Sequence, residues 1–282
     1  MNKTTRRQFL ASSALGFAAG GLLATRSRAE SAMLLKKDGF DRLNFGMASY
    51  TLRQFDLENT LKMTNRLGLK NIAFKSFHLP LDSTPDDIAS VAAKVKEAGL
   101  NLYGGGVIYM EDEDQVNNAF EYARLAGMQT IIGVPEHGLL PLVEQKVKEY
   151  DISVAIHNHG PGDKRYPTAQ SVYEKVNGLD KRIGLCLDIG HTQRLGIDPS
   201  GPARLYADRL LDVHIKDVDA ATTEGKAVEI GRGVIDIPQF LATLMEIHFA
   251  GKVSLEYEKD ADDPLPGCAE SIGYLRGVMA VI

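Results

Sequence analysis

Eight short apolar runs alternate with longer amphipathic stretches along this chain, and that alternation restricts the fold more than any other feature. The runs are almost continuously apolar, which is typical of parallel strands that are covered on both faces. Between them, apolar residues recur at helical spacing, as in residues 84–98. The predicted strands are residues 44–48, 71–74, 100–103, 130–134, 152–156, 183–187, 210–215 and 252–256, and the clearest predicted helices are 84–98, 112–126 and 236–247.

Eight strand–helix units in one chain of this length predict an α/β fold, a single (β/α)8 TIM barrel. An open doubly wound sheet would instead need a glycine-rich turn after the first strand, and residues 48–51 (Ala-Ser-Tyr-Thr) are not one. Four glycines follow predicted helices where a left-handed cap residue is expected. They are Gly68, Gly99, Gly127 and Gly251.

The first 29 residues are predicted to be a signal peptide, followed by a lead-in segment (30–42) and the barrel (43–282). Residues 5–10 contain Arg6-Arg7 followed by Phe9-Leu10, which resembles a twin-arginine export motif. The apolar run after it is short and glycine-rich, so we expect no stable membrane span after processing. Ser27-Arg28-Ala29 offers a small-x-small cleavage site. We therefore expect a periplasmic or otherwise exported protein, with an uncleaved anchor or a disordered basic tail as the alternative.

Charge and cysteine content exclude further classes. The formal net charge is −5 and no basic run lies beyond the extreme N-terminus, so a nucleic-acid partner is not expected. Cys186 lies in an apolar strand and Cys268 far along the chain, and we expect no disulfide between them.

Potential metal ligands stand at the ends of four consecutive predicted strands, the fifth to the eighth. They are His157, Asp188, His214 and Glu256. In a (β/α)8 barrel these ends meet at one rim, where catalytic groups lie. Each residue alone has an ordinary structural explanation, such as a helix N-cap for Asp188. Together they predict one divalent metal ion, since a shared cation removes the cost of burying four ionisable groups.

Residues 155–163, 185–199, 211–219 and 253–258 resemble the xylose-isomerase-like TIM barrel superfamily, the sugar phosphate isomerase/epimerase family, and residues 75–81 and 229–233 also fit it. The resemblance extends over residues 43–275. It implies a metal held by Glu, Asp, His and Glu on strands five to eight, with the two Glu residues exchanging a proton next to a carbonyl from opposite faces. This chain matches three of these positions and has His157 in place of the first Glu.

Two histidines, an aspartate and a glutamate favour Mn first, with Fe, Co or Zn as alternatives. The leading hypothesis is a metal-dependent isomerase- or epimerase-like enzyme that abstracts a proton next to a carbonyl of a sugar or keto-sugar. The missing carboxylate leaves open a lyase that performs β-elimination on 3-keto-glycosides. A non-catalytic sugar-binding barrel stays open as well, while the acidic charge argues against the DNA-repair endonucleases of the superfamily.

Further residues after strand ends are expected to line the pocket. Glu256, Lys216 and His191 are the predicted catalytic residues, and Lys75, His78, His159, His191 and Lys216 are the predicted substrate contacts. A neighbouring cation would lower the pKa of Lys216, although a salt bridge from Lys216 to Asp188 or Asp217 is the simpler alternative. Gly231-Arg232-Gly233 is expected to form a turn rather than a phosphate site. The expected partner is a small-molecule sugar or glycoside, and a homo-oligomer is compatible with the sequence.

Overall fold

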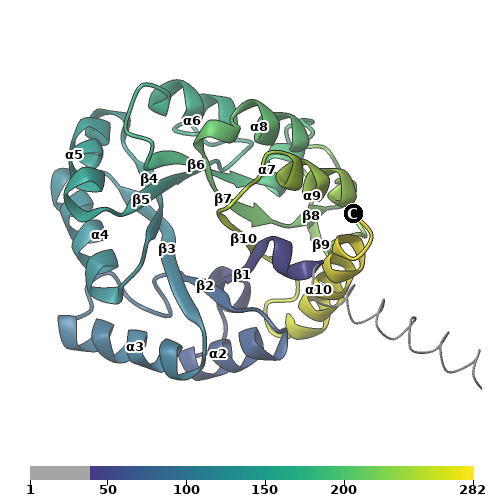
Figure 1. The fold of residues 1–282 in the computed structure, drawn as a ribbon, viewed down its shortest axis with the longest axis horizontal. Coiled ribbons are helices and arrows are strands. Elements are labelled where there is room, and N and C mark those ends of the chain that lie inside the picture. The colour runs from purple at the N-terminus through teal and green to yellow at the C-terminus, as the bar shows by residue number, and fades with distance from the viewer. Residues whose placement is uncertain (1–38) are drawn as a thin grey trace, which may run out of the picture.

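A computed structural model describes residues 39–282 of the chain (Figure 1). Eight parallel strands form a closed barrel in the order β1-β10-β7-β6-β5-β4-β3-β2. The barrel strands are β1 (Asn44–Ala48), β2 (Asn71–Phe74), β3 (Asn101–Met110), β4 (Thr130–Pro135), β5 (Ser153–His157), β6 (Ile183–Asp188), β7 (Leu210–Ile215) and β10 (Lys252–Leu255). The predicted (β/α)8 TIM barrel is therefore confirmed.

Helices surround the strands as an outer ring (Figure 1). They are α2 (Leu57–Arg66), α3 (Pro85–Glu97), α4 (Glu113–Ala126), α5 (Leu140–Tyr150), α6 (Ala169–Val176), α7 (Ile189–Gln193), α8 (Ser200–Leu205), α9 (Ile237–Glu246) and α10 (Leu265–Met279). Short 3-10 turns lie at Phe40–Arg42, Ser49–Leu52, His137–Leu139 and Ala207–Arg209.

Side-chain caps explain where several of these helices begin. Asp56, Thr84 and Asp112 each accept a hydrogen bond from the backbone N–H three residues later, at the starts of α2, α3 and α4. Such a bond satisfies one of the four N–H groups that a helix leaves free at its N-terminus. These caps hold each βα connection on the rim where the strands end.

The barrel has two apolar regions. The larger core lies between strands and helices, and a smaller cluster fills the barrel interior with Ala73, Tyr103, Ile132, Ala155 and Cys186. A polar layer crosses that interior. Within it the Tyr103 hydroxyl lies 2.7 Å from Ser254 Oγ, and the Cys186 thiol lies 3.5 Å from Asp212 Oδ1.

Most predicted strands lie within one or two residues of the observed ones, with one exception. The third was predicted to end at residue 103, but β3 extends to Met110 because Gly104, Gly105 and Gly106 continue as strand and pair with β4. That extension brings Tyr109 to the rim. A two-stranded antiparallel hairpin, β8 (Asp217–Val218) and β9 (Ala227–Val228), follows β7 and was not predicted.

Three of the four predicted left-handed glycines are confirmed, with φ of +73° at Gly68 and Gly99 and +70° at Gly127. The prediction for Gly251 is wrong, because His248 takes the left-handed conformation after α9, at φ +53°. Gly251 meets a different need, since a Cβ there would collide with the carbonyl oxygen of Leu211.

The predicted signal peptide and most of the lead-in segment lie outside the described residues. Within residues 39–282, no helix is long and apolar enough to cross a bilayer. Cys186 and Cys268 are both buried and free, which confirms the prediction of no disulfide between them.

Candidate active site

The four predicted ligands lie together at the carboxyl-terminal rim of the barrel. His157 ends β5, Asp188 ends β6, His214 lies near the end of β7, and Glu256 follows β10 directly. All four are buried, and one ligand atom from each lies within 4.8 Å of the others. Lys216 and Asn158 contact these residues, Glu258 contacts Lys216, and we call the seven together the ligand group.

The distances within the group fit a shared cation. His157 Nε2 lies 3.1 Å from His214 Nδ1 and 3.3 Å from Asp188 Oδ2, and His214 Nδ1 lies 3.2 Å from Glu256 Oε2. Ligand atoms at ordinary metal–ligand distances from one ion lie about 3.0–3.4 Å apart. Asp188 Oδ2 is buried and faces two members of the ligand group, His157 Nε2 at 3.3 Å and Lys216 Nζ at 2.8 Å. The residues present therefore fit a metal.

Local structure aims Asp188 into the group. Its Oδ1 accepts the backbone N–H of His191 at 2.8 Å, which caps α7, so Oδ2 faces the other ligands. The side-chain oxygen of Asn158 accepts the backbone N–H of Asp188 at 3.0 Å. Asp188 is thus both the N-cap that ordinary helix chemistry expects and a candidate ligand. Sequence reasoning missed Asn158, although it directly follows His157.

The titration states of His157, Asp188 and Glu256 suit metal binding. Burial lowers the pKa of His157 to about 3, so its imidazole is neutral at physiological pH, the form that binds metals. Burial alone would raise the pKa of Asp188 and Glu256. However, His191 and Lys216 hold the pKa of Asp188 well below its usual value, and Lys216 and His214 do the same for Glu256. Both carboxyl groups are therefore ionised. For His214, burial lowers the pKa but Glu256 outweighs burial and raises it, so this histidine gives up its proton only when a cation replaces it.

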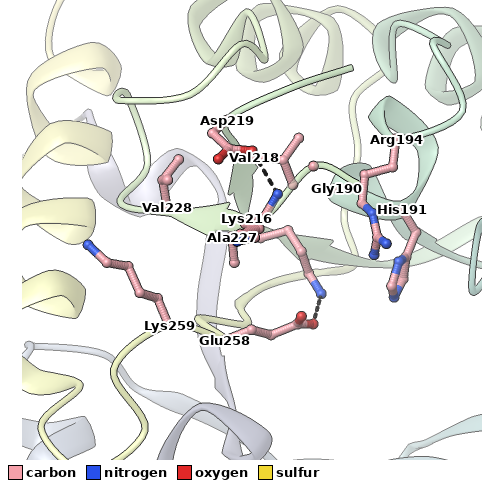
Figure 2. A pocket seen from close by; sticks show the side chains of 12 residues that line it. Gly190, His191, Arg194, Lys216, Val218, Asp219, Ala227, Val228, Glu258 and Lys259 are labelled. Carbon is pink, nitrogen blue, oxygen red and sulfur yellow. Dashed lines mark hydrogen bonds and ion pairs between the residues drawn. The ribbon is translucent and has the colours of Figure 1, made fainter. Parts of the chain in front are cut away.

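Lys216 lies against these carboxylates, with 3% of its side chain exposed. Its Nζ lies 2.8 Å from Asp188 Oδ2, 2.6 Å from Glu256 Oε2 and 2.5 Å from Glu258 Oε1 (the Glu258 contact is drawn in Figure 2). Burial lowers the pKa of Lys216, but the three carboxylates outweigh it and raise that pKa well above its usual value. Without a cation in the group the lysine is therefore a charged donor, and the lowering expected from a neighbouring cation stays a prediction.

Gly190 leaves room for this lysine, because a Cβ there would lie 2.5 Å from Lys216 Cγ and Cδ. Sequence reasoning missed Glu258. Its signal was its position two residues after Glu256, which places both side chains on the same side of an extended segment.

His191 and His159 lie at the edge of the ligand group. His191 Nε2 is 4.0 Å from Asp188 Oδ2, and the His159 ring centroid is 4.4 Å from that of His157. His159 Nε2 also lies 3.3 Å from the Tyr109 hydroxyl. Both histidines are half-buried, so each presents part of its ring to the mouth of the barrel. Their predicted contact with substrate stays a prediction.

Lys75 and His78, after β2, differ from each other. The Lys75 ammonium donates to the carbonyl oxygen of Val107 at 2.9 Å; burial lowers its pKa, and Glu256 opposes that shift. His78 is 5% exposed, and its ring nitrogens lie within 3.0 Å of Ser49, Thr60 and Phe55. These bonds give His78 a structural role, and its contact with substrate stays a prediction.

The segment Gly231-Arg232-Gly233 forms a turn, as expected. The backbone N–H groups of Gly231 and Gly233 donate to Asp217 Oδ2 at 2.9 and 3.0 Å, and those of Ile235 and Val218 donate to Oδ1. The carboxylate of Asp217 thus occupies the donors that a phosphate would need.

A family model described as "Xylose isomerase-like TIM barrel" matches residues 137–278, which is just over half of the chain. The chain belongs to this family. The matched region contains all four candidate ligands and both strands of the small hairpin.

Among curated proteins, the chain is similar to the rhizopine catabolism protein MocC of Rhizobium meliloti, at 26% identity over 145 residues. The alignment covers 46% of this chain and 44% of that protein, so the chain spans less than half the length of this relative.

Two solved structures illustrate the shared fold. The IolI protein, solved with a bound zinc atom, has a TM-score of 0.69 at 18% identity, covering 84% of this chain and 98% of that one. The 3-keto-D-glucoside 4-epimerase YcjR of E. coli has a TM-score of 0.67 at 16% identity, covering 83% of this chain and 99% of that one. At these identities the likeness shows the fold alone.

Proposed function

We propose that this chain is a divalent-metal-dependent enzyme of the isomerase or epimerase kind, which removes a proton next to a carbonyl of a sugar or keto-sugar. The observation that carries the proposal is the charge of the ligand group. Asp188, Glu256 and Glu258 bring three negative charges against the single ammonium of Lys216. Buried charges of this kind are paired or coordinate metals. With His214 neutral, as a metal-binding imidazole must be, one divalent cation would make the group neutral.

His157, Asp188, His214 and Glu256 would hold the ion, and this donor set suits Mn, Fe, Co or Zn. When bound, the cation supplies a Lewis acid that polarises a substrate carbonyl. We also propose that the protein is exported, because residues 5–10 resemble a twin-arginine motif, and that it carries this metal when it is exported.

The chain's own residues account for the proton movements. Glu256 is ionised and is the candidate base: its carboxylate takes the proton from the carbon next to the carbonyl, and the electron pair moves to the carbonyl oxygen, giving an enediolate. Lys216 stays cationic and donates a hydrogen bond toward the negative charge that develops. His191 and His159 are placed to contact hydroxyl groups. The hydroxyl proton on the adjacent oxygen moves to the former carbonyl oxygen, and Glu256 returns the carbon-bound proton to the neighbouring carbon, which completes an isomerisation.

One specific observation favours a second candidate. His157 stands where the resemblance implies a second carboxylate, and its neutral imidazole has a pKa of only about 3 through burial. A one-base reaction is then favoured. In a lyase, the same proton removal by Glu256 would be followed by expulsion of the substituent on the β carbon, as in β-elimination from a 3-keto-glycoside.

Purified, Mn-loaded protein incubated in D2O with aldoses, ketoses and 3-keto-glycosides would test the proposal by NMR. Deuterium appearing on a carbon without bond cleavage indicates an isomerase or epimerase, and release of an aglycone indicates the lyase. Glu256→Gln should lower the rate by a factor of about 10²–10⁴, the usual contribution of a general base. Glu97→Gln, on the exposed end of α3, is the matched control.

Elemental analysis of the same samples tests the metal. Wild type should hold one ion per chain, and His157→Ala should lose it, while His137→Ala, outside the ligand group, should keep it. Protein without stoichiometric metal after Mn loading, and without turnover of any substrate class, would indicate a non-catalytic sugar-binding barrel and would refute the proposal.

A further inference from the structure

A pocket of about 540 Å³ opens beside Lys216 (Figure 2), the lysine that contacts the candidate ligands Asp188 and Glu256. His191 and Arg194 lie next to each other on one side of Lys216, Lys259 lies on the other, and the hairpin β8–β9 forms a wall. The volume is within the usual range for small-molecule sites. Lys216, His191 and Glu258 belong both to this pocket and to the surroundings of the ligand group, so a molecule reacting at Glu256 would extend into it.

Two of the four lysine and arginine cations that line the pocket are already paired. Lys216 Nζ lies 2.5 Å from Glu258 Oε1, and Lys259 Nζ lies 2.8 Å from Glu229 Oε1. A divalent cation bound among the candidate ligands would similarly balance the negative charges of Asp188 and Glu256. These pairs contribute little net charge to the pocket.

The other two cations, Arg194 and Lys226, form no ion pair within 4.0 Å anywhere in residues 39–282. Arg194 Nη2 donates to the carbonyl oxygen of Thr223 at 2.7 Å, which ties the guanidinium to the hairpin. Its Nε is buried and has no acceptor among residues 39–282. An arginine donor that is held in place and lacks an acceptor is suited to an anionic ligand.

Two carboxylates line the pocket, and of these Asp219 forms no ion pair within residues 39–282. Its Oδ1 accepts the backbone N–H of Lys226 at 2.7 Å. Among the residues that line the pocket, Arg194 and Lys226 against Asp219 leave one positive charge; Glu224, in the loop between β8 and β9, is near Arg194 but does not line the pocket. In a chain whose formal net charge is −5, this local excess beside the reacting group is a specific feature.

We propose that this pocket binds an anionic group of the substrate, a carboxylate or a phosphate, so that the enzyme acts on an anionic sugar rather than a neutral one. The single excess charge favours a carboxylate, as in a sugar acid. Arg194 provides the planar donors and Lys226 the second positive charge. The inference rests on the proposed function for the place of the reacting carbon, but the anion contacts are independent of the metal.

Isothermal titration calorimetry on the Mn-loaded full chain tests this with three probes, D-glucuronate, D-glucose 6-phosphate and D-glucose. We expect glucuronate or glucose 6-phosphate to bind at least tenfold more tightly than glucose, a difference of about 1.4 kcal/mol. The tighter of the two anions identifies the source of the negative charge. Arg194→Gln should weaken binding of that anion about tenfold and leave glucose within twofold. Lys226→Gln should have a smaller effect in the same direction, because its side chain is exposed.

Arg66→Gln, an exposed arginine at the end of α2, is the matched control and should change neither affinity. Absence of any preference for the anionic probes, or a preference that Arg194→Gln leaves intact, overturns the inference. Elemental analysis of the same samples separates the two proposals. Metal present without anion preference refutes only this inference, and anion binding through Arg194 in protein that takes up no metal refutes only the proposed function.

Discussion

Replacing Lys216 by methionine tests whether an ammonium and a metal ion share the same carboxylates. The change keeps the length of the side chain and removes its charge, at a position where 3% of the side chain is exposed. The ammonium contacts Asp188, Glu256 and Glu258 at 2.5–2.8 Å. Without it, three carboxylates face one another, and His214, 3.2 Å from Glu256, is the nearest group that can carry a positive charge.

The magnitude follows from the cost of breaking a buried ion pair, about 3–5 kcal/mol when one partner is removed. For a domain of this size, each kcal/mol lowers Tm by about 2–4 °C. In EDTA-treated protein we therefore expect Lys216→Met to melt about 6–20 °C below wild type. Mn²⁺ should recover most of that loss, because a divalent cation restores the missing positive charge. The variant should also bind Mn²⁺ at least tenfold more tightly, since the ammonium no longer repels the ion.

Scanning calorimetry of EDTA-treated and Mn-saturated protein measures the first effect, and EPR of free Mn²⁺ measures the second. Lys94→Met, on the exposed face of α3, controls for the loss of a lysine elsewhere. An unchanged Tm without metal, or weaker Mn²⁺ binding, would refute the charge argument. A wild type that binds no Mn²⁺ and a variant that does would show that Lys216 takes the place of the ion, and the proposed function would fail.

Two further predictions concern buried carboxyl groups outside the ligand set. Burial raises the pKa of Asp212 to about 7, so as the pH rises this carboxyl group ionises in the unfolded chain before it does so in the folded one. The free energy of unfolding of wild type should therefore fall by up to about 4 kcal/mol between pH 4 and 7. Asp212→Asn should lack this fall when denaturant midpoints are compared at pH 5 and 8. Asp217→Ala leaves four backbone N–H groups without their acceptor and should cost about 3 kcal/mol or more. Hydrogen exchange should then accelerate at Gly231 and Gly233, and unchanged protection there would contradict the prediction.

The parts of the molecule that could be predicted from the sequence are those set by strand periodicity. Buried parallel strands have almost continuously apolar sequences, and all of them end at the same rim of a barrel. The first polar residue after each run therefore lies near the others, which is why His157, Asp188 and Glu256 could be placed together from their positions alone. His214 followed from the same reasoning although it lies inside β7.

The parts that could not be predicted depend on loop conformation. Arg194 reaches the pocket only because α7 ends there and the hairpin β8–β9 folds back to meet its guanidinium. His78 follows a strand end as a site residue would, but its ring nitrogens bond to Ser49 and Thr60 from other segments, which the sequence did not predict. Neither the hairpin nor these partners has a periodic signal, since each arises from contacts between segments far apart in the chain.

The histidine at position 157 and the positive pocket are connected by charge. The resemblance implies three ligand carboxylates, and with Glu258 and Lys216 present such a set would keep one negative charge after binding a divalent cation. His157 is neutral, so the group found here would be brought to zero by the same ion. A negatively charged centre would repel an anionic substrate at close range, whereas a neutral one beside Arg194 and Lys226 would not. The departure from the family pattern therefore fits a change in the charge of the substrate as well as in the number of bases.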